Sequence, residues 1–244
     1  MRRVPTLMRR ELISYFRSPL AYVLAGVFSG IILLFSWRGL EEGPKLLIPG
    51  LIRFGSFLMI FLVPILTMRL LAQERDTGAL EVLVTDPVTD WDIVLGKYLA
   101  SVLALWAMLL PLGVYVLLYW IIGRMTEPPA PLTWGPVLTG FLGLALLGAL
   151  FAAVGLFASS LTGNQAISAL IGFVMILILW AFVLLEQFFD GTAAHELIKS
   201  LSLFNRMDLL VEGRLDTRSL FLFASTIALM LYLTVRVVES RKWR

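Results

Sequence analysis

Six long apolar stretches alternate with shorter polar ones along this 244-residue chain. Each stretch is long enough to cross the hydrocarbon core of a bilayer as a helix, which takes about 20 residues. We expect membrane spans at 20–37, 54–71, 98–122, 134–158, 166–185 and 219–235. Residues 128–185 carry no charged side chain and are too long for one crossing. The polar sequence at 159–165 is therefore expected to form a tight turn between two spans.

The segment before the first span has the periodicity of an amphipathic helix. Apolar residues recur at helical spacing, and the arginines lie on the opposite face. This pattern predicts a helix at 4–17 that lies at the membrane interface with its apolar face toward the bilayer. An ordinary solvated helix that leads into the first span is the alternative. The residues assigned to the interfacial helix are Leu7, Met8, Arg9, Arg10, Leu12, Tyr15, Phe16 and Arg17.

The distribution of basic residues predicts the orientation of the chain. Six spans place both termini on one side, and the two termini together with residues 69–97 hold twelve Lys and Arg, against eight in the remaining loops. Basic residues next to spans favour the cytoplasmic side, so both termini are expected there. The segment 186–218 is then the longest external loop, with a short amphipathic helix expected at 195–204 and Asp216 or Thr217 capping the last span. These features predict an all-α integral membrane protein, with residues 1–244 forming a single transmembrane domain.

The polar segment between the second and third spans is strongly acidic. Residues 72–98 hold six acidic and two basic side chains, and residues 79–83 place apolar side chains on one side of a short helix. Asp86-Pro87 ends that helix, and Thr89 with Asp92 forms a predicted capping box that opens the third span. A merely soluble turn would leave the apolar side unexplained, so we expect the cytoplasmic segment 72–97 to dock a partner.

Composition and motifs argue against catalysis by this chain. It is 59% hydrophobic and 15% charged, which is more apolar than a soluble domain. With no cysteine and one histidine it cannot form a thiolate or multi-histidine metal site, and His195-Glu196 lacks the second histidine of a zinc protease. Gly96-Lys97 lacks the first glycine of a phosphate-binding loop. The span centres carry no charged residue, which argues against an ion pump. We expect no metal, no cofactor, no nucleic acid and no enzymatic activity in this chain.

Four stretches resemble those of one transporter family. The run MRLLAQERDTGALEVLVTDPVTDWDIVLGKYLA resembles the signature region of type-2 ABC exporter permeases, where an acidic residue, Thr-Gly and Leu-Glu-x-Leu precede a proline and a later Gly-Lys. RRELISYFRSPLAY, FASSLTGNQAISALIGF and SLFNRMDLLVEGRLDTRSLFLF are similar as well, so the resemblance covers most of the chain. The subgroup it resembles most is the permease subunit of the gliding-motility ABC transporter. The copper-delivery permease of nitrous oxide reductase maturation is similar too.

The resemblance implies a half-transporter of six helices. Such a subunit pairs with a second copy or a homologous permease, and each half engages a separate cytoplasmic ATPase subunit, two per complex, which binds ATP and Mg. The N-terminal helix corresponds to the elbow helix, and residues 74–85 to the coupling helix that contacts the ATPase. The coupling-helix contacts it implies are Glu74, Arg75, Thr77, Gly78, Leu80, Glu81 and Leu83. The second, smaller contact it implies is Thr162, Gly163, Asn164 and Gln165.

The sequence thus predicts a permease subunit in the cell inner membrane, in an ATP-driven exporter. Energy from the partner ATPase would drive transport or force transmission across the membrane. Membrane lipids and an accessory extracytoplasmic protein are further expected partners. The alternative is a membrane scaffold that recruits a cytoplasmic ATPase complex without transporting anything. The motifs indicate how the partner ATPase delivers energy to the permease. They do not identify the substrate.

Overall fold

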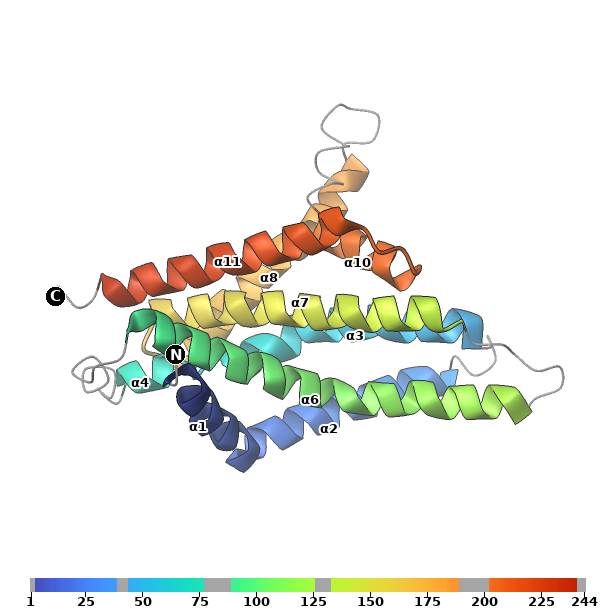
Figure 1. Ribbon diagram of the computed structural model, residues 1–244, viewed down its shortest axis with the longest axis horizontal. Coiled ribbons are helices and arrows are strands. Elements are labelled where there is room, and N and C mark those ends of the chain that lie inside the picture. The colour runs from blue at the N-terminus through green and yellow to red at the C-terminus, as the bar shows by residue number, and fades with distance from the viewer. Residues whose placement is uncertain (1–2, 39–43, 77–88, 126–132, 189–201, 241–244) are drawn as a thin grey trace.

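The computed structural model describes residues 3–38, 44–76, 89–125, 133–188 and 202–240, and within these ranges every regular element is a helix (Figure 1). The helices are α1 Arg3–Arg17, α2 Pro19–Arg38, α3 Pro44–Thr67, α4 Ala72–Asp76, α6 Asp90–Met125, α7 Trp134–Leu161, α8 Gln165–Phe188, α10 Leu203–Val211 and α11 Thr217–Glu239. This confirms the predicted all-α class.

Six stretches of the described residues are long and apolar enough to cross a membrane. They are Pro19–Trp37, Leu47–Asp76, Asp90–Met125, Trp134–Leu161, Gln165–Val183 and Thr217–Glu239. The number matches the prediction, but several helices extend beyond the expected spans. The third begins eight residues before 98, at Asp90, because a helix continues through polar turns that hydropathy alone assigns to a loop.

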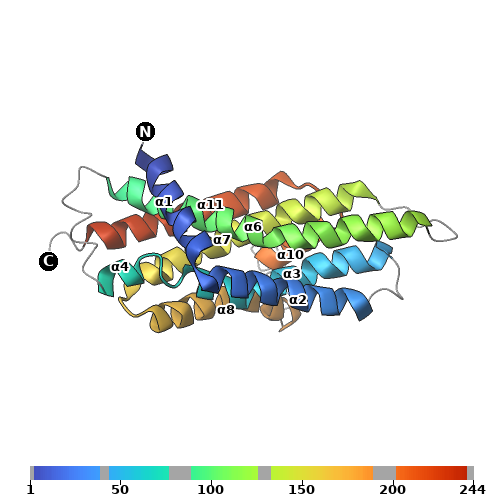
Figure 2. The same cartoon turned by 90° about the horizontal axis from the view of Figure 1, so that it is seen from below.

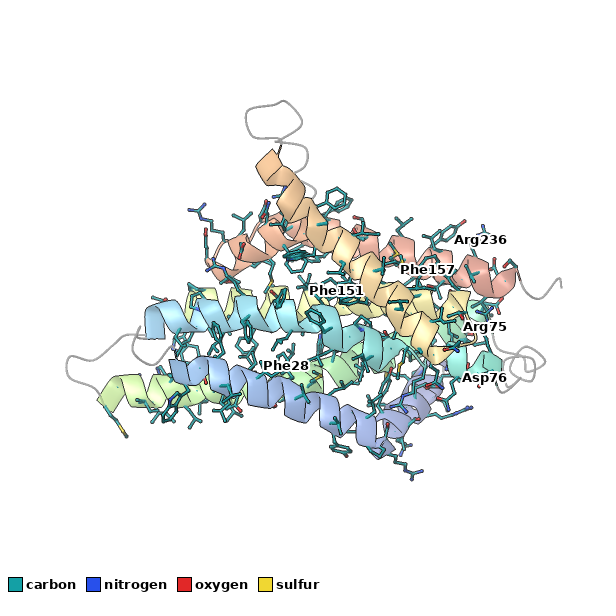
Figure 3. All side chains as sticks on the ribbon, turned by 180° about the vertical axis from the view of Figure 1, so that it is seen from behind. Phe28, Arg75, Asp76, Phe151, Phe157 and Arg236 are labelled. Atoms are coloured by element: carbon teal, nitrogen blue, oxygen red, sulfur yellow. The ribbon has the colours of Figure 1, made fainter. Side chains whose placement is uncertain are left out.

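Helix α7 forms the centre of the bundle, where it packs against α3, α6, α8, α10 and α11. Its small residues let these neighbours approach closely. A Cβ atom added at Gly155 would clash with Thr67 Oγ1 of α3, and one added at Gly143 would lie 2.6 Å from Met207 Sδ of α10. Phe151 and Phe28 are fully buried within the bundle (Figure 3). The core is therefore built around close backbone contacts of α7.

The outer faces of the bundle are strongly apolar. Leu34 of α2, Leu110 of α6 and Leu170 of α8 each expose more than 60% of their surface. Exposed leucines at this level are unfavourable in water and favourable in lipid. The α8 helix leans away from the others over part of its length (Figure 3). These faces are suited to contact lipid tails or another membrane helix.

Both termini of the described chain lie toward the same end of the bundle. The start of α1, the end of α11 and α4 occupy the left part of Figure 1, and Arg75, Asp76 and Arg236 lie together at the corresponding end in Figure 3. The opposite end holds the start of α3 and the end of α6. Six crossings with the termini on one side agree with the even number of spans.

Candidate functional site

The helix that contains the second span breaks near the end occupied by the termini. Helix α3 ends at Thr67 and α4 begins at Ala72. Ser159 of α7 bridges the break, because its hydroxyl accepts hydrogen bonds from the N–H groups of Leu71 (3.0 Å) and Ala72 (2.9 Å) and donates one to the carbonyl of Met68 (3.0 Å). Ser159, Leu71 and Ala72 are fully buried, so the two N–H groups have no access to water. A single side chain satisfies polar groups that a broken helix leaves unpaired.

The predicted turn between the fourth and fifth spans is confirmed. Helix α7 ends at Leu161 and α8 begins at Gln165. Asn164 caps α8, since its Oδ1 accepts from the N–H groups of Ala166 (2.9 Å) and Ile167 (3.3 Å). Its own N–H donates to Thr162 Oγ1 at 3.1 Å, which closes the turn.

Helix α4 lies directly against this turn. The Arg75 guanidinium donates a hydrogen bond to the carbonyl of Ser160, at the end of α7. A Cβ atom added at Gly163 would lie 3.8 Å from Arg75 Cβ and 4.0 Å from the Asp76 nitrogen. The structure thus brings together two segments that the sequence analysis assigned separately as partner contacts. The views of Figures 1 and 2 agree in placing them at one end.

Three charged side chains, one each from α1, α4 and α6, lie in contact with one another. Lys97 Nζ of α6 lies 2.7 Å from Glu74 Oε1 of α4 and 3.0 Å from Glu11 Oε1 of α1. The side chains of Lys97, Glu74 and Glu11 are 5%, 14% and 18% exposed. Charges this buried are stable only when they are paired. This ion triad, Glu11–Lys97–Glu74, ties α1, α4 and α6 to one another.

The triad changes the interpretation of two predicted features. Glu74 was assigned to a contact with an ATPase, whereas its Oε1 atom points into the protein and pairs with Lys97. Lys97 was considered as part of an incomplete phosphate loop and as part of the Gly-Lys in the family resemblance. The signal that could have found it is a lysine two turns into an apolar helix, where an unpaired cation would be costly. Its partners, 86 and 23 residues away, leave no local pattern.

Helix α1 is amphipathic as predicted, but much of its apolar face packs on protein. A Cβ atom added at Gly96 of α6 would lie 2.9 Å from Leu7 Cβ, which shows how closely the two helices approach. Tyr15 is buried, and its hydroxyl donates to the carbonyl of Leu66 at 3.3 Å. Ile13 and Phe16 remain exposed for contact with a membrane.

Burial also affects the acidity of the Tyr15 side chain. Loss of hydration raises the pKa of its phenol well above the usual value, and the Glu11 carboxylate raises it further, while Arg69 opposes the shift. The hydroxyl therefore stays protonated and keeps its donor role. Arg69 also donates a hydrogen bond to the Ser18 hydroxyl, which links the α3–α4 break to the corner between α1 and α2.

The capping box that opens the third span is confirmed. The Thr89 N–H donates to Asp92 Oδ2 at 3.3 Å, and the Asp92 N–H donates back to Thr89 Oγ1 at 3.3 Å. The remaining implied coupling-helix contacts are Thr77, Gly78, Leu80, Glu81 and Leu83, and they lie outside the described residues.

The opposite part of the bundle carries helix α10. Thr139 of α7 donates from Oγ1 to the carbonyl of Leu210 at 2.6 Å, and Arg53 pairs with Asp208 at 2.7 Å. The short helix expected at 195–204 differs from α10, Leu203–Val211, and residues 195–201 lie outside the described ranges. The predicted cap of the last span is confirmed, because Asp216 accepts from the Arg218 N–H.

The described ranges hold no group of three or more His, Cys, Asp or Glu side chains suited to a metal ion. A family model described as ABC-2 family transporter protein matches residues 42–205, which is more than half of the chain. The chain belongs to the ABC-2 transporter family. The match extends from the start of α3 to α10 and includes both the α3–α4 break and the α7–α8 turn. A comparison with curated proteins finds no match.

Membership of the ABC-2 transporter family identifies the general kind of protein. It is a multi-pass membrane protein and the permease subunit of an ABC transporter. The family implies a partner ABC ATPase, since the permease is the membrane component of such a transporter. The likeness to gliding-motility and copper-delivery permeases remains a prediction from the sequence.

Proposed function

We propose that this permease is an exporter subunit of the inner membrane, driven by a cytoplasmic ATPase that docks on α4 and the α7–α8 turn. The observation that carries the proposal is the adjacency of these two segments. Their sequences lie about 90 residues apart, and the resemblance implied a contact for each. A single globular partner can contact both only if they share one surface, and the hydrogen bond from Arg75 to the Ser160 carbonyl holds α4 against the end of α7 beside the turn.

The hydrogen bonds and ion pairs behind this surface suit it to transmit force. A push on α4 reaches α1 and α6 through the ion triad and reaches α7 through Ser159. These contacts are buried, so water does not compete for them and relative sliding would break them. The docking surface is therefore coupled to three further helices, α1 and α6 through Lys97 and α7 through Ser159.

The remaining parts of the proposal concern the assembly. The ATPase subunits, two per complex, bind ATP and Mg, while this chain supplies no nucleotide site. A second permease copy or a homologous permease completes the transmembrane pathway. Both termini face the cytoplasm, as the basic residues near the first and last spans favour. An accessory extracytoplasmic protein would bind at the α10 end.

Co-purification with the co-expressed ATPase tests the docking surface. The variant Asp76→Arg/Gln165→Arg adds three positive charges to that surface and is expected to lose most of the bound ATPase. Asp76 is exposed and Gln165 partly so, and no hydrogen bond of either side chain supports the fold in the described residues.

The matched control is Glu212→Arg/Leu215→Arg, which makes the same change in charge on exposed residues near α10. The control is expected to retain the ATPase. Loss of the ATPase from the control with full retention by the first variant would place the docking surface at the opposite end and overturn the proposal.

A further inference from the structure

An open groove of about 750 Å³ runs along α1 to the point where α2 begins. Four arginines and two serines supply most of its polar lining: Arg9, Arg10, Arg17, Arg69, Ser14 and Ser18. None of the residues that line it is acidic. Neither the ion triad nor the α3–α4 break accounts for a concave surface with four guanidinium groups.

The positive charge of the groove is largely uncompensated. Arg9, Arg10 and Arg17 are exposed, and within the described part of the chain no carboxylate forms an ion pair with them. The nearest acidic residue on the same helix, Glu11, does not line the groove and is paired with Lys97. Arg69 extends from the α3–α4 break and contacts Ser18. Four guanidinium groups so close together favour an anion between them.

The position of the groove identifies the kind of anion. It ends at Pro19, the first residue of the first membrane span, so it lies where that helix enters the bilayer. Ile13 and Phe16, at 40% and 49% exposure, lie beside the arginines, and Tyr22 and Val23 on the adjoining turn of α2 are about 60% exposed. A basic pocket bordered by exposed apolar side chains matches a molecule with a phosphate head and hydrocarbon tails.

We propose that this groove binds the phosphate of an anionic phospholipid. The guanidinium groups of Arg9, Arg10, Arg17 and Arg69 hold the phosphate oxygens, and the acyl chains follow the exposed face of α2. A soluble anion would use the arginines but would leave the apolar border without a role. The inference rests on the membrane location of the family and is independent of the docked ATPase. It assigns to α1 a lipid contact that holds the elbow corner at the bilayer surface.

Native mass spectrometry of the detergent-purified full-length chain tests this binding. Phosphatidylglycerol is titrated against the wild type and the variant Arg9→Gln/Arg10→Gln/Arg17→Gln, with phosphatidylcholine as the zwitterionic reference. Because each arginine near an anionic surface contributes to lipid attraction, the triple variant is expected to bind phosphatidylglycerol about a hundredfold more weakly. The thermal unfolding midpoint of both proteins is measured as a check of folding, since the three side chains are exposed.

The matched control is Arg124→Gln/Arg214→Gln/Arg218→Gln, which removes three exposed arginines distant from the groove. It is expected to keep the wild-type affinity. Equal weakening in both variants, or unchanged binding in the groove variant, would overturn the proposal. Competition arms with inorganic phosphate and glycerophosphoglycerol distinguish the sources of the phosphate. Displacement of the lipid by either soluble anion at equal concentration would make this a site for a soluble phosphate and overturn the lipid assignment.

Discussion

The two ends of the bundle hold ion pairs of the same length in different surroundings. Lys97–Glu74 and Arg53–Asp208 each have a 2.7 Å separation between nitrogen and oxygen. The lysine of the first pair is 5% exposed, whereas both side chains of the second are 48% exposed. Water and salt screen the exposed pair, while the buried lysine depends on its partners for stability. Burial, and not distance, therefore distinguishes the end that we propose to transmit force from the opposite end.

The largest expected effect comes from removing the shared cation. Lys97→Met removes the cation that pairs with the carboxylates of Glu11 and Glu74, which costs about 3–5 kcal/mol of unfolding free energy. Chemical unfolding of the purified chain in detergent measures this loss. The variant Glu11→Gln/Glu74→Gln/Lys97→Met removes all three charges and is expected to recover much of the stability. Wild-type stability in the single variant would contradict the buried triad.

An intermediate effect is expected at the helix break. Ser159→Ala removes the acceptor for the Leu71 and Ala72 N–H groups, so about 1–3 kcal/mol of stability is lost. Ser160→Ala is the matched control, because the Ser160 hydroxyl donates only to the carbonyl of Phe157 within its own helix. The same unfolding assay compares them. If both substitutions cost the same, Ser159 does not stabilise the α3–α4 break, and the proposed coupling of α4 to α7 through Ser159 is wrong.

The smallest effect is expected at the other end. Arg53→Met breaks the exposed pair with Asp208 and is expected to change stability by less than about 1 kcal/mol. Raising the salt concentration should reduce even this effect, since exposed charges are screened. A loss of unfolding free energy from Arg53→Met as large as that from Lys97→Met would contradict the predicted difference between the exposed and the buried ion pair.

Local pattern was enough to predict much of the fold. The length and hydropathy of the apolar stretches predict the six spans. The polar residues between them predict the α7–α8 turn and the caps at Thr89 and Asp216. These features depend on residues within a few positions of one another, so a single sequence contains the signal.

The features that connect distant helices could not be predicted in this way. Ser159 bonds to residues about 90 positions earlier, and Glu11 meets Lys97 across 86 positions. Residues 68–71, which lie between α3 and α4, include no proline or glycine from which the break could be predicted. The apolar face of α1 was found from its period, but periodicity does not say whether lipid or α6 covers it. Tertiary contacts decide all of these points.

Site-specific cross-linking tests the docking end most directly. The chain has no cysteine, so Asp76→Cys and Leu215→Cys each introduce a unique thiol on an exposed residue, one beside the α7–α8 turn and one near α10. Each variant is co-expressed with its ATPase and treated with a thiol-to-amine cross-linker. We predict a covalent permease–ATPase product from Asp76→Cys and none from Leu215→Cys. A product from Leu215→Cys alone would contradict the account.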